Sequence, residues 1–231
     1  VTILLDHDHH VLSARLHIVE FRGFERFVQG RPIQEIPVLV QRLCGICPVS
    51  HHLCAAKAVD GILGIDRLTP TGEKMRRLMH YGQMFQSHAL HFFYLAAPDL
   101  LFGFESPVAT RNIIGIAAAH PELARQGVAM RRFGQEIVQA TAGKRIHGTG
   151  AIPGGINKNL SPAERDALRA EMATMLAWSR QAVALAREFT LGHFDELAAL
   201  GTFASHHVSL VRPDGAMELY DGVLRARDAA G

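Results

Sequence analysis

Apolar residues recur at helical spacing through the middle of the chain. The clearest run begins near Pro70 and consists of Met75, Leu78, Met79, Gly82, Phe85, Ala89 and Phe92. Spacings of three and four residues place these side chains on one face of a helix. Thr69 supplies a cap and Pro70 a first turn. The pattern predicts one long helix with a broad apolar face.

Two more helices are predicted further along the chain. Residues 121–142 have a helical pattern, and residues 148–159 form a loop rich in Gly, Pro and Asn. Ser161 and Glu164 fit a capping box, in which each side chain bonds to the backbone N–H of the other residue. A long helix rich in Ala and Leu should follow, to about Thr190.

The first residues have the composition of strands. Thr2–Asp6 and Val11–Phe21 are rich in β-branched and apolar residues, and they flank the polar turn Asp6–His10. This arrangement predicts a β hairpin, although the turn also resembles a weak metal-binding site. An exposed polar turn is the preferred interpretation.

The expected fold class is mainly α with a small N-terminal β hairpin. The chain has 231 residues, and its 48% hydrophobic content is enough for a substantial core. We expect a β element at 1–21, a mainly helical core at 22–200, and the start of a less regular, strand-containing insert at 201–231. No firm boundary divides these parts.

Charge and hydropathy exclude two classes of partner. The formal net charge is +2, and Lys and Arg are scattered, so the basic surface of a nucleic-acid-binding protein is not expected. No apolar run reaches the roughly 18 residues of a membrane span, and no secretory signal opens the chain. We therefore expect a cytoplasmic protein.

The three cysteines, Cys44, Cys47 and Cys54, lie close together in the sequence. An odd number in so short a segment favours reduced thiols or metal ligands over a disulfide framework. Cys54 is most simply a small buried residue on the helix that follows Cys47.

The segment 42–52 concentrates the candidate chemistry. Cys44 and Cys47 are separated by two residues, so both sulfurs can face one metal ion. Pro48 is suited to open a helix, whose N-terminus would favour the thiolate form of Cys47, and Arg42 adds positive charge. His51 would lie on the same helix face as Cys47 and could donate to its sulfur.

A Cys-x-x-Cys pair alone leaves several interpretations open. These are half of a zinc site, a thioredoxin-like redox pair, a reduced pair without function, and a more elaborate metal centre. The redox interpretation lacks its βαβ setting. A zinc ion would need two more ligands, and His51 or Cys54 could supply them only with awkward geometry.

Several motifs of the sequence resemble those of nickel-iron hydrogenase large subunits. The string Arg42-x-Cys44-Gly45-x-Cys47-x-x-x-His51 is similar to their first metal-binding signature. The segments 20–32 and 86–93, and the string His147-Gly148-x-x-x-x-Pro153-Gly154-Gly155, are similar to other segments of the soluble, multimeric cytoplasmic branch. The resemblance extends to about Asp166 and implies the helical fold of those subunits.

The resemblance implies a role for each matching residue. Cys44 would be a terminal ligand of nickel, and Cys47 would bridge nickel and an iron that carries carbon monoxide and cyanide. His51 and Arg42 would support this cofactor. Glu25 matches a magnesium-binding glutamate of the family, although by itself it reads as a solvated helix residue.

The resemblance also implies an activity and partners. Family members split H2 heterolytically, and electrons leave through iron-sulfur clusters in a small subunit. The motifs most resemble those of bidirectional NAD-coupled enzymes, in which diaphorase subunits bind FMN and NAD. Methyl-viologen-type hydrogenases are similar, so the final electron acceptor stays open.

The sequence departs from the family pattern in two places. It contains no second Cys-x-x-Cys pair, and it starts downstream of the motif whose glutamate is the usual candidate for proton transfer. We therefore expect part of a longer subunit, against the alternative of a degenerate homologue that never carried nickel. The rival functions are a cofactor-less, quinone-module relative of the respiratory complex I type and a zinc-binding interaction domain.

Three histidines fall on the predicted long helix. The helix would carry His80, His88 and His91, and the last two lie in a segment that resembles the family. We expect hydrogen-bonded core histidines rather than metal ligands.

Overall fold

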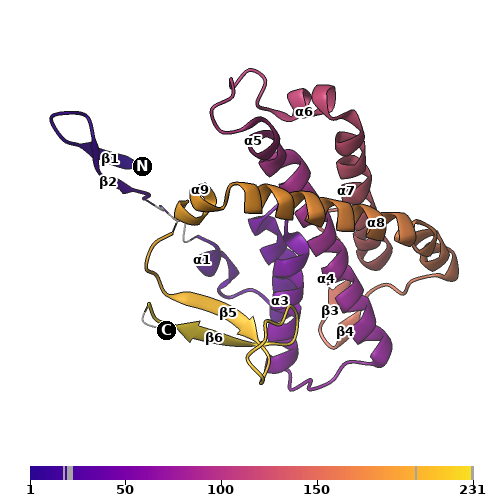
Figure 1. Ribbon diagram of the computed structural model, residues 1–231. Helices are drawn as coiled ribbons and strands as arrows, with labels where there is room; N and C mark the ends of the chain where they lie inside the picture. The colour runs from indigo at the N-terminus through magenta and orange to yellow at the C-terminus, as the bar shows by residue number, and fades with distance from the viewer. Residues whose placement is uncertain (18, 20–22, 201, 230–231) are drawn as a thin grey trace.

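The computed structural model describes residues 1–17, 19, 23–200 and 202–229, and it is mainly helical. Its elements are β1 (Thr2–Leu5), β2 (Val11–Arg15), α1 (Phe24–Val28), η1 (Ile33–Glu35), α2 (Ile36–Leu39), η2 (Val40–Leu43), α3 (Pro48–Ile62), α4 (Pro70–Leu90), η3 (His91–Ala96), α5 (Ala97–Phe102), α6 (Ile113–Ala119), α7 (Pro121–Ala142), β3 (Ala151–Ile152), β4 (Gly155–Ile156), α8 (Pro162–Gly192), α9 (Phe194–Ala199), β5 (His207–Val211) and β6 (Val223–Arg227). Helices α4 and α7 lie side by side, and α8 crosses them (Figure 1).

The predicted N-terminal hairpin is present and stands away from the helices (Figure 1). Strands β1 and β2 are antiparallel, and the Asp6 carboxylate accepts the backbone N–H groups of Asp8 and His10 at 2.8 Å each. The second strand is shorter than predicted, because it ends at Arg15 rather than Phe21. Part of the predicted strand, residues 18, 20 and 21, lies outside the described residues.

The long central helix has its predicted start but a different end. The Thr69 side chain caps α4 by accepting the N–H of Gly72 at 3.1 Å. We predicted a single helix through Phe92, whereas α4 ends at Leu90 and continues as the π-helix η3. Pro98 lacks a backbone N–H for the carbonyl four residues earlier, so a regular α-helix cannot continue into α5.

Glycines allow α4 and α7 to pack with their backbones in close contact. A Cβ on Gly134 would lie 2.7 Å from the backbone nitrogen of Gln86 and from the carbonyl oxygen of Gly82. A Cβ on Gly82 would lie 2.5 Å from the Ile137 side chain. The two helices are antiparallel, and this close packing fixes their register.

The predicted capping box opens α8. Ser161 accepts the N–H of Glu164 at 3.2 Å, and the Glu164 carboxylate accepts the N–H of Ser161 at 2.8 Å. The Lys158 ammonium, and then the N–H and hydroxyl of Ser161, donate to the Glu164 carboxylate and lower its pKa to about 2. Of the described residues of α8, Met175 alone is buried, where it packs on the apolar face shared by α4 and α7.

A buried ion pair joins α3, α4 and the β3–β4 hairpin. The guanidinium of Arg76 donates to Asp60 at 2.6 Å, to the carbonyl of Ile152 at 2.7 Å and to that of Gly155 at 3.0 Å. Asp60 also accepts the N–H of Gly154 at 2.7 Å. Each charge is therefore paired and hydrogen-bonded, as burial requires.

The predicted insert after residue 200 contains strands, as expected. Strands β5 and β6 pair in an antiparallel hairpin, and the connection between them reaches α3 and α4. Tyr220 packs between Lys57 and Arg77, 4.1 and 4.5 Å from its ring centroid. The placement of the domain boundaries at 21 and 200 stays a prediction.

Among the described residues, no helix combines the length and apolar character needed to cross a membrane.

Replacing Arg76 with Met should destabilise the chain strongly. The Asp60 carboxylate would stay buried without its partner, which costs roughly 3–5 kcal/mol of unfolding free energy. Urea unfolding followed by circular dichroism measures the change. The control is Lys74→Met, because Lys74 is exposed on the same helix. Equal losses in the two variants would show that the buried pair does not hold these elements together.

Candidate metal centre

The Cys-x-x-Cys loop connects η2 to α3. Cys47 is the N-cap residue of α3, and Pro48 is its first residue, as predicted. Cys44 has an extended backbone and ends η2, and both cysteines are half-buried. The loop therefore lies at the N-terminus of a helix of 15 residues.

Cys44, Cys47 and His51 form one cluster of potential metal ligands. One ligand atom from each residue lies within 4.8 Å of the others. His51 Nε2 lies 3.7 Å from Cys47 Sγ, because a spacing of four residues brings both to one helix face. His51 is therefore close enough to both cysteines to share an ion with them. Cys54 is exposed and is not part of this cluster, so the expectation of a buried Cys54 is wrong.

The two thiols have different electrostatic environments. Hydrogen bonds from the Cys47 side chain and backbone, and from the N–H of Ile46, lower the pKa of Cys44, and the two N–H groups lie 3.2 and 3.4 Å from its sulfur. Burial raises the pKa of Cys47 to about 11, and the neighbouring Cys44 adds to the rise. The predicted preference for thiolate at Cys47 is therefore wrong without a metal, because the loop N–H groups point to Cys44 instead.

Two glutamines of α4, which sequence reasoning missed, hold the loop from one side. Gln86 donates to the carbonyl of Ile46 at 2.9 Å. Gln83 accepts the N–H of Ser50 at 3.0 Å and donates to its hydroxyl at 2.7 Å. Both glutamine side chains are buried, and the bonds that they make to the loop are partly buried. The signal that could have indicated this role is the presence of these polar residues within the apolar stripe of the predicted helix.

His52, also missed, is a fully buried support of the loop. Its Nε2 accepts the N–H of Ala151 at 2.9 Å, so the proton resides on Nδ1, which donates to the carbonyl of Pro37 at 2.7 Å. Burial lowers the pKa of His52 and keeps the ring neutral. The ring therefore joins α3 to α2 and to β3.

The other two predicted site residues lie outside the cluster. Arg42 is exposed on η2, two residues before Cys44. Glu25 is exposed in the first turn of α1, and it belongs to neither group of potential metal ligands found among the described residues. The roles of Arg42 and Glu25 stay predictions.

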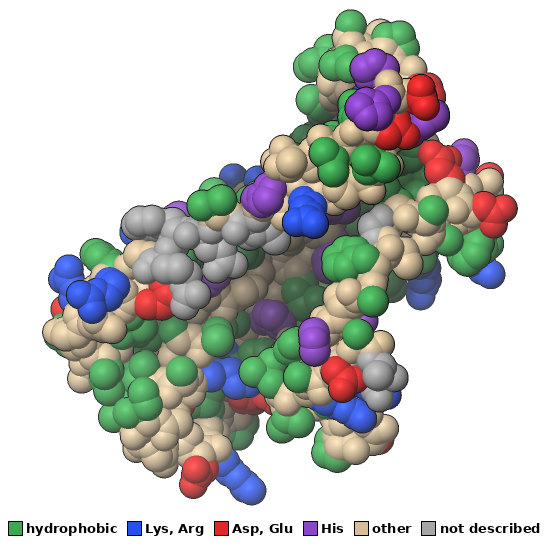
Figure 2. Space-filling model, turned by 90° about the vertical axis from the view of Figure 1, so that its left-hand side faces the viewer, with side chains coloured by type: hydrophobic (Ala, Val, Ile, Leu, Met, Phe, Trp, Pro, Cys, Tyr) green, Lys and Arg blue, Asp and Glu red, His purple; other side chains and the backbone are tan. Residues whose placement is uncertain are grey.

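A second group of potential ligands lies in the N-terminal turn. Ligand atoms of Asp6, Asp8 and His10 lie within 4.8 Å of one another. The Asp6 carboxylate already accepts two backbone N–H groups, which lower its pKa. Figure 2 shows histidine and acidic side chains on a lobe that protrudes from the molecule. This geometry fits the exposed polar turn that the sequence suggested.

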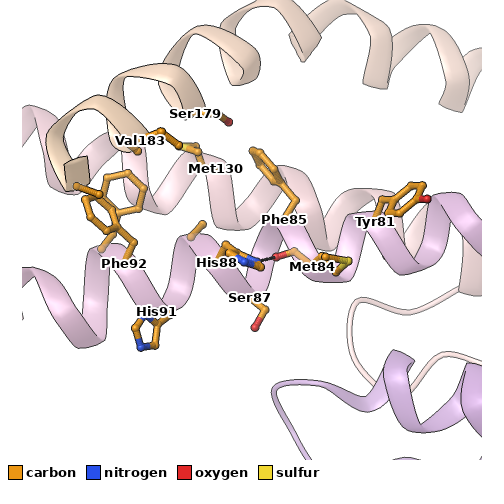
Figure 3. Close-up of a pocket in the computed structure, with 14 residues that line it drawn as sticks. Tyr81, Met84, Phe85, Ser87, His88, His91, Phe92, Met130, Ser179 and Val183 are labelled. Atoms are coloured by element: carbon orange, nitrogen blue, oxygen red, sulfur yellow. Dashed lines mark hydrogen bonds between the residues drawn. The ribbon is translucent and has the colours of Figure 1, made fainter. Parts of the chain in front are cut away.

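A large apolar groove of about 720 Å³ lies between α4, η3, α7 and α8 (Figure 3). His88 and His91 line it and are exposed, so the prediction of core histidines is wrong for both. His88 Nδ1 donates to the carbonyl of Met84 at 2.8 Å. His80 is partly buried and donates to the carbonyl of Leu219 at 2.9 Å. Helical spacing alone does not distinguish residues on the face of α4 that packs on α7 from residues at the edge of that face, beside the groove.

Comparisons with known proteins identify the family of the chain. Residues 22–102 match the family model described as nickel-dependent hydrogenase. The chain is 44% identical to the beta subunit of the NAD-reducing hydrogenase HoxS of Cupriavidus necator, over 99% of this chain and 49% of that protein. It is also 44% identical to one subunit of the F420-non-reducing hydrogenase vhu of Methanococcus voltae, over 97% of this chain and 53% of that protein.

A solved structure has the same fold. It is the crystal structure of an NAD+-reducing NiFe hydrogenase in the H2-reduced state, with 60% identity and a TM-score of 0.92 over 99% of this chain and 51% of that chain. The predicted fold class is thereby confirmed. The chain spans about half the length of the relatives it matches. It belongs to the nickel-dependent hydrogenase family, in which it corresponds to the N-terminal half of the large subunit.

Proposed function

We propose that the chain supplies half of the active site of a nickel-iron hydrogenase that cleaves H2 reversibly and heterolytically. The observation that carries the proposal is the cluster of Cys44, Cys47 and His51 at the N-terminus of α3. Its membership of a nickel-dependent family supports the assignment of the metal.

The side chains of the cluster fit a nickel-iron centre. Thiolates are soft ligands that suit both metals. Cys44 would be a terminal ligand of nickel, and Cys47 would bridge nickel and an iron carrying carbon monoxide and cyanide. A second Cys-x-x-Cys pair, beyond this sequence, would complete the ligands. When bound, the centre supplies the Lewis acid and the redox couple for H2 cleavage.

The chain's own residues would hold and tune the two sulfurs. The N–H groups of Ile46 and Cys47 lie close enough to stabilise negative charge on Cys44. His51 lies within reach of Cys47 Sγ and could donate to it once that sulfur is a thiolate. Arg42 would add positive charge near the loop.

We propose two kinds of partner for the whole subunit. A small subunit with iron-sulfur clusters would accept the electrons, because the chain's three cysteines cannot hold such clusters as well. Diaphorase subunits that bind FMN and NAD would follow. The names of the HoxS relative and of the NAD+-reducing structure support NAD, whereas the equally similar F420-non-reducing relatives keep the methyl-viologen type as the alternative. The cytoplasmic location stays a prediction.

We also propose that Glu25 binds magnesium. The support is its match to a family position and its exposed place in the first turn of α1. Carboxylate oxygen is the ligand that Mg²⁺ prefers.

Infrared spectra of the anaerobically purified full-length subunit, with its metals quantified, test the metal centre. We expect sharp carbon monoxide and cyanide bands and nickel and iron in equal amounts. Cys44→Ser and Cys47→Ser should abolish the bands, because each removes a soft ligand.

Cys54→Ser is the matched control and should keep the bands, because Cys54 lies outside the cluster. Zinc alone, without bands, would support a zinc-binding domain. Absence of metal would support the cofactor-less relative of the complex I type.

The complex purified with its native partner subunits should reduce NAD+ with H2. The initial rate of NADH formation at 340 nm under H2 measures this activity, and the Cys44→Ser complex gives the background. Reduction of methyl viologen without reduction of NAD+ would assign the chain to the methyl-viologen type.

Glu25→Gln should lower the magnesium content of the full-length subunit, because a neutral amide binds Mg²⁺ less well than a carboxylate. Elemental analysis after dialysis measures the metal. Glu35→Gln, at an exposed glutamate of η1, is the control. Unchanged magnesium in Glu25→Gln would overturn the assignment.

A further inference from the structure

His147 has a backbone conformation that side chains rarely adopt. Its φ is 55°, in the left-handed region that normally favours glycine. A residue held there signals a constraint imposed by the surrounding structure. His147 also lies in the motif that starts His147-Gly148, to which the function proposed above gives no role.

The segment around His147 is held rigidly against α4 and α7. The N–H of Thr149 donates to the carbonyl of Ala142 at 3.1 Å, and Gly143 ends α7 in a left-handed conformation. A Cβ on Gly148 would lie 2.6 Å from the carbonyl oxygen of Ala142, and one on Gly150 would lie 2.6 Å from that of Thr141. These close contacts leave the backbone beside His147 little freedom.

The His147 ring contacts the metal-binding loop from a distant part of the sequence. Its Nε2 lies 3.1 Å from the carbonyl oxygen of Gln41 and 3.2 Å from that of Cys44. Because both partners are acceptors, the proton resides on Nε2, and the ring donates to them. His147 therefore binds the end of η2, where the Gln41 carbonyl also accepts the N–H of Cys44 at 3.3 Å.

The carbonyl of Cys44 sets the direction of the loop that follows. The next two peptide groups carry the N–H groups of Ile46 and Cys47, which point to Cys44 Sγ. Gln86 holds the carbonyl of Ile46 from α4. His147 and Gln86 thus fix the two ends of the short segment whose N–H groups surround the sulfur.

We propose that His147 is a positioning residue of the metal centre, which holds the Cys44 carbonyl so that the N–H groups of Ile46 and Cys47 face the Cys44 sulfur. It acts through the backbone and is no ligand, since His147 is not a member of the metal-ligand cluster. The inference deepens the proposed function and rests on it for the identity of the metals.

Hydrogen exchange and infrared spectra of the full-length subunit test this role. His147→Leu removes the donor, and His147→Gln restores an N–H near the Nε2 position. Neither replacement is glycine, so neither relaxes the left-handed backbone at this position. In His147→Leu the backbone N–H groups of residues 44–47 should exchange about two- to tenfold faster, as expected for one lost hydrogen bond. The carbon monoxide and cyanide bands should shift, because Cys44 loses hydrogen bonds, and His147→Gln should restore both readouts.

Two controls separate positioning from folding. His147→Asn tolerates the left-handed backbone, but its amide is too short to reach the carbonyls, so it should behave like His147→Leu even if the leucine variant folds poorly. His120→Leu, at the opposite end of α7, should match the wild type in both readouts.

Wild-type exchange and bands in His147→Leu, or failure of His147→Gln to restore them, would overturn the role of His147. A wild-type subunit without carbon monoxide and cyanide bands would overturn the proposed function. In that case the exchange measurement, which needs no metal, still decides whether His147 positions the loop.

Discussion

The buried guanidinium of Arg76 is the constraint on which the arrangement around the Cys-x-x-Cys loop depends. It is fully buried and donates to Asp60 and to two carbonyls of the β3–β4 hairpin. A charge removed from water is tolerated only where such partners surround it. Correct pairing therefore requires α3, α4 and the hairpin to occupy one relative position, and α3 carries the candidate ligands at its other end.

Helix α4 serves the core and the site with different faces. Glycines and apolar side chains pack on α7, whereas Arg76, Gln83 and Gln86 point to α3 and its loop. Because α4 contacts both the core and the loop, the packing of α4 in the core also sets the position of the cysteines. The π-helix that continues α4 lies beyond this region, so its irregular turn does not disturb the loop.

Burial is uneven over the described residues, and this fits a chain that spans half of its relatives. Helix α7 buries nine residues, whereas α8 buries one of its 31. Many large hydrophobic side chains are exposed, and an apolar groove lies between α8 and α4 (Figure 3). A helix such as α8 gains most of its stability from packing, and the described residues pack against one side of α8 only.

The sequence by itself determined the long helices, their caps and the cysteine pair with His51, because helical periodicity, capping and a spacing of four residues are local properties. Only the tertiary structure decided which distant side chains hold the Cys-x-x-Cys loop. It brought His52, Gln86 and His147 to the loop. The physical reason is that these contacts join residues 40 to 103 positions apart, and packing of whole helices, rather than local pattern, fixes such distances.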